Sequence, residues 1–422
     1  MSAPLRVCID ARLAVSDSGG TASFALSLVR ALTKLADGDE QYYYLLNRGD
    51  SDKLTRLVGT PIRTIEARVI RPNLAHRFGE KVPFAKSTWK ILKQLGMQFG
   101  RNTGPKVAKS DGTLERQGID VVHFTAQYAF LTNIPSIYHP HDLQHRHLPQ
   151  FFAMSERANR EYLYSTLCKH ASIVSVVSQW GKEDLMRSFD LPESKIRIVH
   201  FAPEVHGETR CASGGVGAVA QKFELPNRFI FYPARTWPHK NHLRLLHALK
   251  KILTDKGMVV SLVCSGAPTE FYGKIKKEIK KLRLQDQVRF VGFVNFEEVG
   301  ELYDLCSGVI IPTLFEAGSF PLWEAFLTGK PAACSNVTSL PGQAGDAALI
   351  FDPYDVDEMA KAIERLWTER ELCATLVARG KENLARYSWD TTARTFRALY
   401  RELGKRALST EDEELLSRRP LM

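Results

Sequence analysis

Two glutamates in one short segment, Glu316 and Glu324, have the type and spacing for carbohydrate chemistry. The residues around them predict a strand over 309–312 and a helix over 321–328, with proline in its first turn, where the missing N–H group costs nothing. The N–H groups and dipole at a helix start attract an anion such as phosphate, and carboxylates there can bind sugar or ribose hydroxyls. A plainer alternative stays open, in which Ser319 caps the helix and both glutamates are solvated.

A second segment, YPARTWPHKNH, places Arg235 and Lys240 between a predicted strand (229–233) and a predicted helix (241–254). Arginine can bind a diphosphate through two N–H groups at once, and lysine binds it as a point charge. Two surface charges are the alternative. However, cations near a helix N-terminus are electrostatically unfavourable, so a bound anion would explain their position.

The elements that must position these side chains follow a regular alternation of short apolar runs and helical patterns. The predicted strands are 6–10, 42–46, 121–124, 136–139, 173–178, 229–233, 259–264, 288–291, 309–312 and 331–335. This order predicts an α/β fold with parallel sheets, divided into two Rossmann-like domains. Ligands bind beyond the carboxyl ends of such strands, so a cleft between the domains is the expected active site.

The predicted domain boundaries follow from a stretch rich in Gly, Ala and Ser near the middle of the chain. They give an N-terminal domain over 1–205, a linker over 206–226, a C-terminal domain over 227–385, a helix over 386–405 that returns to the N-terminal domain, and a polar tail over 406–422 that is frayed from Ser409.

Four segments together resemble one family. The residues from Glu316 to Glu324 match the E-x7-E motif of the retaining glycosyltransferases of family 4, and YPARTWPHKNH resembles the diphosphate-binding loop of that family. IDARLAVSDSGGTASFALSLVRAL is similar to its N-terminal Gly-Gly loop, and HDLQHRHLPQFF to a His-Asp loop of bacterial members. The resemblance covers roughly residues 5–400. It implies the GT-B fold, in which two Rossmann-like domains face each other across a cleft.

The resemblance implies a role for each matched charge. Arg235 and Lys240 would hold the donor diphosphate and stabilise the leaving group. Glu316 would face the hydroxyls of the donor sugar, and Glu324 would bind the ribose. The acceptor would enter on the face from which the diphosphate leaves, and the departing phosphate would help to deprotonate it. Such a site needs cations in a closed, dry cleft.

Backbone groups and one base contact are also implied by the resemblance. The N–H groups of Gly318, Ser319 and Phe320 would help to hold the sugar and phosphate, and the turn at Phe293 would contact the base. The family often has glycine at the position of Ala317 and at that of Ser319, so these departures predict a donor-sugar pocket of different shape.

Three further positions are assigned near the reacting centre by the same resemblance. Gly19 and Gly20 would let the backbone approach the phosphate and the acceptor, because glycine has no Cβ atom. His141 would lie close to the reacting atoms.

A metal site is the alternative interpretation of the histidine-rich loop. His139, His141, His145 and His147 surround Asp142, and imidazoles and carboxylates suit zinc. The match to the glycosyltransferase loop favours a site with no metal, as does the lack of a D-x-D motif in a suitable loop. We therefore expect no metal and no cofactor, with a nucleotide-diphosphate sugar as co-substrate.

The predicted reaction moves a sugar from GDP-mannose, or in second place from a UDP-sugar, to a glycan or lipid-linked glycan of a surface polysaccharide. Two alternatives remain open at this point. One is a non-catalytic protein that binds nucleotide sugars as a scaffold, and the other is a nucleotide-sugar epimerase of the same architecture.

The charge of the chain is concentrated in one segment. The 422 residues carry a net charge of +10, and residues 68–109 hold ten Lys or Arg and one acidic residue, a net charge of +9. Within it, 84–99 fits an amphipathic helix with lysines opposite its apolar face, which predicts either a core-packed helix or contact with an anionic membrane. No recognition motif supports nucleic acid. Scattered cysteines and no long apolar run predict a cytoplasmic protein, peripheral on the inner membrane face at most.

Overall fold

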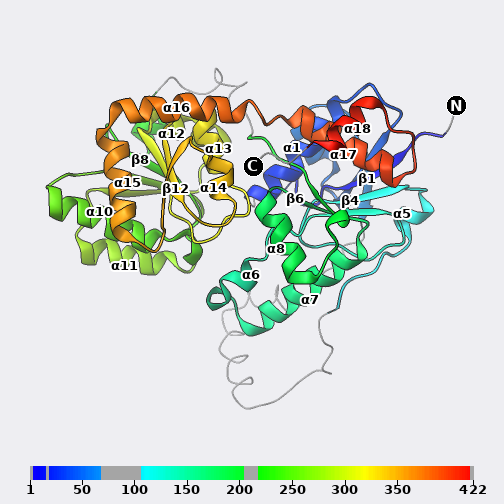
Figure 1. Ribbon diagram of the computed structural model, residues 1–422, viewed down its shortest axis with the longest axis horizontal. Coiled ribbons are helices and arrows are strands. Elements are labelled where there is room, and N and C mark those ends of the chain that lie inside the picture. The colour runs from blue at the N-terminus through cyan, green and yellow to red at the C-terminus, as the bar shows by residue number, and fades with distance from the viewer. Residues whose placement is uncertain (1–2, 16–18, 68–105, 204–216, 419–422) are drawn as a thin grey trace, which may run out of the picture. The chain divides into compact units, whose positions relative to one another are not determined.

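The computed structural model describes residues 3–15, 19–67, 106–203 and 217–418 (Figure 1). Within this part of the chain the strands are β1 Arg6–Asp10, β2 Gln41–Asn47, β3 Arg63–Ala67, β4 Val121–Phe124, β5 Ser136–Tyr138, β6 Ile173–Val176, β7 Ile196–Ile198, β8 Ile230–Pro233, β9 Leu262–Ser265, β10 Val288–Gly292, β11 Gly308–Ile311, β12 Ala332–Ser335 and β13 Ala348–Phe351.

The strands form two parallel sheets. One has the order β3-β2-β1-β4-β5-β6-β7 and the other β10-β9-β8-β11-β12-β13. Strands such as β4 (VVHF) and β6 (IVSV) are buried at every residue, as expected for parallel strands that helices cover on both faces. The prediction of an α/β fold with two parallel sheets is confirmed.

Helices connect the strands. They are α1 Gly20–Lys34, α2 Ser51–Val58, α5 Thr113–Arg116, α6 Gln144–His147, α7 Met154–His170, α8 Gln179–Phe189, α9 Ala218–Lys222, α10 His242–Lys256, α11 Tyr272–Leu282, α12 Phe296–Leu305, α13 Phe320–Leu327, α14 Leu340–Ala344, α15 Val356–Thr368, α16 Arg370–Leu384, α17 Trp389–Leu403 and α18 Thr410–Ser417, with 3₁₀ turns at Pro149–Phe151, Glu193–Lys195 and Pro238–Lys240. Among the helices described, none combines the length and the apolar composition needed to cross a bilayer.

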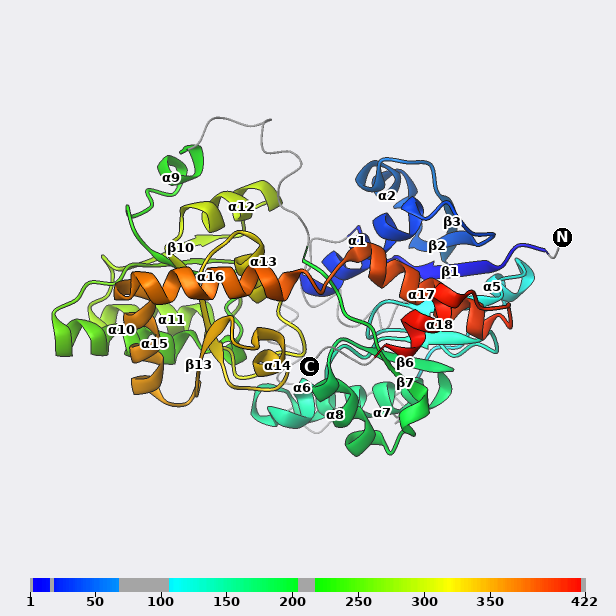
Figure 2. The same ribbon diagram turned by 45° about the horizontal axis from the view of Figure 1, so that its top comes forward.

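The six-stranded sheet packs against α10, α11 and α15, which lie together in Figure 2. Leu249 of α10, Ile275 of α11 and Ile363 of α15 belong to one buried cluster with residues of β8 and β9. This core holds the sheet rigidly, so the loops at the carboxyl ends of its strands start from fixed positions.

By its internal contacts the chain divides into two compact units. The first is Met1–Tyr138 with Ala158–Ser172, and the second is His139–Arg157 with Ile173–Met422. The domain boundaries drawn from the sequence stay predictions. Residues 84–99, most of the basic segment 68–109 and residues 206–216 of the predicted linker lie outside the described residues.

The polar tail is helical where the structure describes it, so the prediction of fraying from Ser409 is wrong over these residues. Ser409 and Asp412 form a capping box at the start of α18, which satisfies two backbone N–H groups of the helix start. Asp412 also accepts a hydrogen bond from Arg401 of α17 (2.8 Å), and Leu415 is buried. These nonlocal contacts, rather than composition, decide the structure of this segment.

Candidate active site

The loops that follow β8, β10, β11 and β12 carry most of the predicted site residues. All of these strands are parallel members of one sheet, so their carboxyl ends lie at the same edge. All of these loops belong to the second compact unit. The topology therefore gathers four segments that are far apart in the sequence.

The loop after β8 holds the two predicted cations and is anchored at both ends. Thr269 donates two hydrogen bonds to Thr236, from its N to Thr236 Oγ1 (2.7 Å) and from its Oγ1 to Thr236 O (2.6 Å). The hydroxyl of Tyr232 donates to Lys240 O (2.7 Å). Arg235 is exposed, with its guanidinium 5.4 Å from the ring centre of Trp237. These hydrogen bonds therefore hold the backbone of the loop from which the side chains of Arg235 and Lys240 extend.

Lys240 reaches the loop after β11. Its Nζ donates to Glu316 Oε2 at 2.7 Å, and the two side chains are 21% and 18% exposed. The structure thus brings together Lys240, which is predicted to bind the diphosphate, and Glu316, which is predicted to bind the donor sugar. Lysine has three N–H donors, so Lys240 can hold Glu316 and a phosphate oxygen at the same time.

Two histidines lie on either side of Lys240 and are uncharged at neutral pH. Burial, reinforced by the charge of Lys240, lowers the pKa of His239 to about 2 and that of His242 to about 3. The positive charge of this loop therefore comes from Arg235 and Lys240 alone.

The backbone of Glu316 is held by the loop after β12. Glu316 N donates to Thr338 Oγ1 (3.1 Å), and Ser339 Oγ donates to Glu316 O (2.8 Å). Two residues further on, a Cβ atom at Gly318 would lie 2.9 Å from Val177 Cγ1, so only glycine fits this close approach. These contacts fix the path of the loop and hence the place of the Glu316 carboxylate.

The start of α13 is fastened by Gln343. Its Oε1 accepts from Ser319 N (2.8 Å), and its Nε2 donates to Ser319 O (2.6 Å). The Ser319 N–H that was predicted to hold the ligand is bonded to Gln343 in the structure. Ser319 makes no side-chain cap, so the capping alternative is wrong. Its buried Oγ has no hydrogen-bond partner among the described residues.

Glu324 lies in the second turn of α13 and is half-buried. Its Oε2 accepts a hydrogen bond from the hydroxyl of Tyr303 (2.7 Å). Phe293 follows β10 and is 63% exposed, and the contact of its ring with the base stays a prediction from the resemblance.

The remaining predicted residues lie elsewhere. Gly19 has φ 77°, which glycine adopts without strain, and Gly20 begins α1 in the first compact unit. His141 lies in the second unit, half-buried, with a left-handed φ of 59° and its ring centre 5.6 Å from that of His139. Gly19 and Gly20 belong to the first unit and the loop with Arg235 and Lys240 to the second, so the place of both glycines near the reacting centre stays a prediction.

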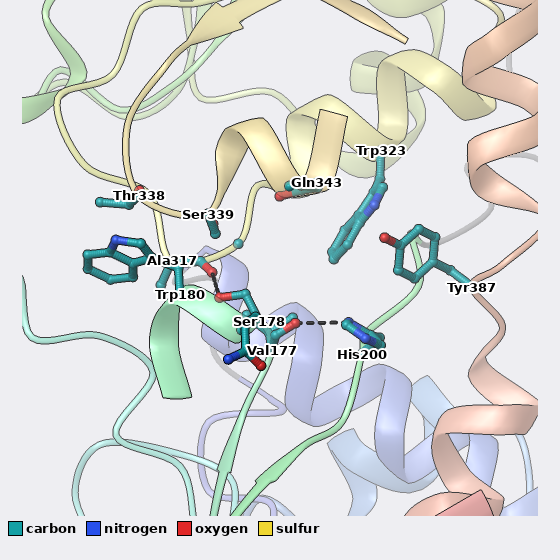
Figure 3. A pocket seen from close by; sticks show the side chains of 13 residues that line it. Val177, Ser178, Trp180, His200, Ala317, Trp323, Thr338, Ser339, Gln343 and Tyr387 are labelled. Atoms are coloured by element: carbon teal, nitrogen blue, oxygen red, sulfur yellow. Dashed lines mark hydrogen bonds between the residues drawn. The ribbon is translucent and has the colours of Figure 1, made fainter. Parts of the chain in front are cut away.

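A pocket of about 100 Å³ lies beside the Glu316 loop (Figure 3). Figure 3 shows Trp180 and Thr338 on one side of it and Trp323, Tyr387 and His200 on the other. His200 Nδ1 bonds to Val177 O (3.0 Å), and burial lowers the pKa of His200. The pocket is bounded by Ala317 and Gly318 of the same loop, and Ala317 is one of the two positions at which the E-x7-E motif departs from the family pattern.

Among the described residues, no group of three or more His, Cys, Asp or Glu side chains is arranged to hold a metal ion. His147, from the histidine-rich loop, bonds instead to both carboxylate oxygens of Asp184 (2.9 and 3.0 Å). Its ring also lies against Trp180 and Phe315.

Sequence reasoning missed the residues that hold the others in place. Thr338, Ser339 and Gln343 fix the loop that carries Glu316, and Tyr303 holds Glu324. The segment SNVTSLPGQAGDAALIFDP, which follows the motif closely, contains the first three and could have indicated them. Nothing in the local pattern around Tyr303 distinguishes it from an ordinary core residue.

Two protein families match the chain in its two halves. The family described as Glycosyltransferase Family 4 matches residues 18–201, and the family described as Glycosyl transferases group 1 matches residues 219–383. The second match contains Arg235, Lys240, Glu316 and Glu324. The chain belongs to the family 4-like glycosyltransferases.

Curated relatives of this chain include mannosyltransferases. It is 27% identical over 230 residues to the O-antigen chain mannosyltransferase B of Escherichia coli. The match covers 54% of this chain and 60% of that protein. It is 28% identical to the MMP alpha-(1->4)-mannosyltransferase of Mycolicibacterium hassiacum, over 53% of this chain and 52% of that protein. The matches thus span little more than half the length of these relatives.

Solved structures share the fold of the family 4-like chain. Anabaena HepE in complex with UDP and glucose has a TM-score of 0.67 at 15% identity, covering 94% of this chain and all of that one. Sucrose-phosphate synthase from Thermosynechococcus elongatus has a TM-score of 0.65 at 17% identity, covering 95% and 99%. The prediction of a GT-B fold built of two α/β domains is confirmed.

Proposed function

We propose that this glycosyltransferase moves a sugar from a nucleotide-diphosphate sugar to a glycan or lipid-linked glycan, with retention at the anomeric carbon. GDP-mannose is the donor we propose first, and a UDP-sugar the second. The observation that carries the proposal is the Lys240–Glu316 contact, in which a cation and a carboxylate lie 2.7 Å apart at the carboxyl edge of the sheet.

The mannosyltransferase names of several relatives support mannose as the sugar, and one of them, the O-antigen chain mannosyltransferase, supports a surface polysaccharide as the acceptor. The similarity of the fold to HepE bound to UDP and glucose supports a nucleotide sugar as the donor class. In this proposal Arg235 and Lys240 hold the diphosphate, Glu324 binds the ribose, and Phe293 lies against the base.

In the proposed reaction, the bond between the anomeric carbon and the diphosphate oxygen breaks as the acceptor oxygen bonds to that carbon. The acceptor proton passes to the departing phosphate, so the products are a nucleoside diphosphate and a glycoside. Arg235 and Lys240 stabilise the charge that grows on the leaving group. We propose that no metal is required, because these two cations supply the charge.

We propose that the reaction takes place on the cytoplasmic side of the membrane, because nucleotide sugars and lipid-linked acceptors meet there. The basic segment 68–109 supports contact with anionic lipid. Flotation with anionic vesicles should retain the wild-type chain and lose a variant with Lys86, Lys90 and Lys93 changed to Glu. Equal flotation of both would contradict the membrane contact.

A donor screen tests the proposed function. GDP-mannose and UDP-sugars are each added to the protein with a mannoside acceptor, and products are identified by mass spectrometry. The correct donor at 100 times its Kd should stabilise the fold by about 2.7 kcal/mol and give a lengthened acceptor. Stabilisation without transfer would indicate a scaffold, and a free epimer without acceptor product would indicate an epimerase. Either result would contradict the proposal.

A further inference from the structure

Tyr303 is a buried residue directly beneath the helix that carries Glu324. It belongs to α12 and is fully buried, with its ring edge-on to Phe231 of β8 (centroids 5.1 Å apart, planes at 88°). Its hydroxyl lies 2.7 Å from Glu324 Oε2 and 3.3 Å from Pro321 O. The ring therefore has little freedom, and the hydroxyl has a fixed place under the first turn of α13.

The direction of this hydrogen bond is settled by chemistry. An ionised carboxylate only accepts hydrogen bonds, so Tyr303 must donate. Burial and the neighbouring Glu324 charge raise the pKa of Tyr303 well above its usual value. The phenol therefore stays protonated and remains a donor over the whole range in which proteins are assayed.

Glu324 is half-buried, and Tyr303 holds one of its carboxylate oxygens, Oε2. The carboxylate has two oxygens, and each can accept more than one hydrogen bond. A half-buried glutamate has rotamer freedom to lose when it binds a ligand. A fixed donor beneath it removes part of that freedom before the ligand arrives, which is the physical basis of preorganisation.

We propose that Tyr303 is a positioning residue that holds Glu324 in the orientation that accepts hydrogen bonds from the ribose hydroxyls of the donor nucleotide. The inference rests on the proposed function, because it needs a nucleotide ligand. It adds a consequence that the function alone does not carry: the discrimination between ribose and deoxyribose depends on a buried tyrosine that does not touch the nucleotide.

A purely structural role for Tyr303 has to be separated from this one. Tyr138 provides the matched control, since it is also buried (1% exposed) and its hydroxyl donates to a backbone carbonyl, Gln127 O, at 2.8 Å. Y138F and Y303F each remove one phenol hydroxyl that donates a hydrogen bond from a buried tyrosine, to a backbone carbonyl in the first case and to a carboxylate in the second. Only Y303F should alter the recognition of ribose.

The experiment measures, by calorimetry, the Kd of GDP and of UDP and of their 2′,3′-dideoxy forms for wild type, Y303F and Y138F. We expect Y303F to weaken binding of the preferred ribonucleotide about tenfold, in line with the loss of a hydrogen bond to a charged group. Binding of the dideoxy form should be unchanged, so the discrimination ratio falls by the same factor. Y138F should leave both Kd values unchanged.

A second variant keeps the test decisive if Y303F fails to fold. E324M leaves Tyr303 in place and removes the acceptor that it positions, so it should abolish the discrimination. Unchanged discrimination in Y303F would overturn this inference while leaving the proposed function standing. Unchanged discrimination in E324M would overturn both this inference and the ribose role that the proposed function gives to Glu324. If wild type bound neither GDP nor UDP, both the proposed function and this inference would be overturned.

Discussion

The two glutamates of the E-x7-E motif are the same residue type, eight positions apart, but they have opposite environments. Glu316 lies in a loop and is paired with a cation, Lys240, across 76 residues of sequence. Glu324 lies on a helix and is paired with a neutral, fully buried hydroxyl, that of Tyr303. The number of donors on each partner separates them further, because lysine has three and tyrosine has one.

This difference indicates different tasks. Lys240 can bind a phosphate oxygen while it still holds Glu316, so this pair can respond to charge that develops during the reaction. The single hydrogen of Tyr303 is already used, so Glu324 is held in one orientation and suits recognition of an unchanging group. We expect changes on the Glu316 side to act mainly on kcat and changes on the Glu324 side mainly on KM.

The largest expected effect is that of K240A. It removes a cation that is proposed to stabilise the leaving group, and it removes the lysine that pairs with Glu316. The loss of one such stabilising group costs about 10²–10³ in rate. We expect kcat for sugar transfer to fall by about 10³. K251A is the control, because Lys251 pairs with Asp255 on the surface of α10 (2.8 Å). A wild-type kcat in K240A would contradict the role of Lys240 in stabilising the leaving group.

The second prediction contrasts the two carboxylates directly. E316Q keeps the size of the side chain but removes the charge beside Lys240, and we expect kcat to fall about 10²-fold. E324Q should raise the donor KM about tenfold with a much smaller change in kcat, since a hydrogen bond to a charged acceptor is worth about 1.5–3 kcal/mol. Steady-state kinetics over a range of donor concentrations measures both. Identical profiles for the two variants would show that the two glutamates share one role.

The third prediction concerns the residue that fastens the loop between them. Q343A removes both hydrogen bonds between the Gln343 side chain and the Ser319 backbone, so the buried N–H of Ser319 loses its acceptor. We expect the free energy of unfolding to fall by about 1–3 kcal/mol and kcat to fall about tenfold, because Glu316 is displaced. Q221A, at an exposed position on α9, serves as the control. Loss of stability with unchanged kcat would mean that the hydrogen bonds between Gln343 and Ser319 do not position Glu316.

The smallest expected effect is the contribution that His242, two residues after Lys240, makes to the pH dependence of stability. His242 is buried, with its pKa lowered to about 3, whereas an unfolded histidine titrates near 6.5. Below pH 6.5 the unfolded chain takes up a proton that the folded chain does not, so stability falls as the pH falls. Between pH 7 and pH 5 this costs about 2 kcal/mol.

H242F should reduce this acid sensitivity by about that amount in urea unfolding at the two pH values. H247F replaces a histidine that is 44% exposed on the same helix and is the matched control. The same pH dependence in H242F and wild type would show that His242 is not the source.

Local patterns predicted the fold well where strands are apolar and complete. Residues 6–10 and 121–124 were predicted with the bounds of β1 and β4. The strand β3 (RTIEA) was missed because polar and charged residues interrupt it at a sheet edge, and β7 (IRI) because three residues are too short for a pattern. Both of these missed strands, β3 and β7, lie at the edges of the seven-stranded sheet.

The charged residues of the site could be predicted because their chemistry is visible in their type and spacing. Their partners could not. The Lys240–Glu316 contact, the bond from Tyr303 to Glu324 and the clasp of Gln343 on Ser319 each join residues 21 or more positions apart. Only the packing of strands in one sheet brings such residues together.

The most direct test of the account is the anomeric configuration of the product. Wild-type protein is supplied with GDP-mannose, or with the UDP-sugar that the screen selects, and an acceptor, and the new linkage is examined by nuclear magnetic resonance. The account predicts a glycoside with the anomeric configuration of the donor, together with one free nucleoside diphosphate per linkage. A product of inverted configuration would contradict it.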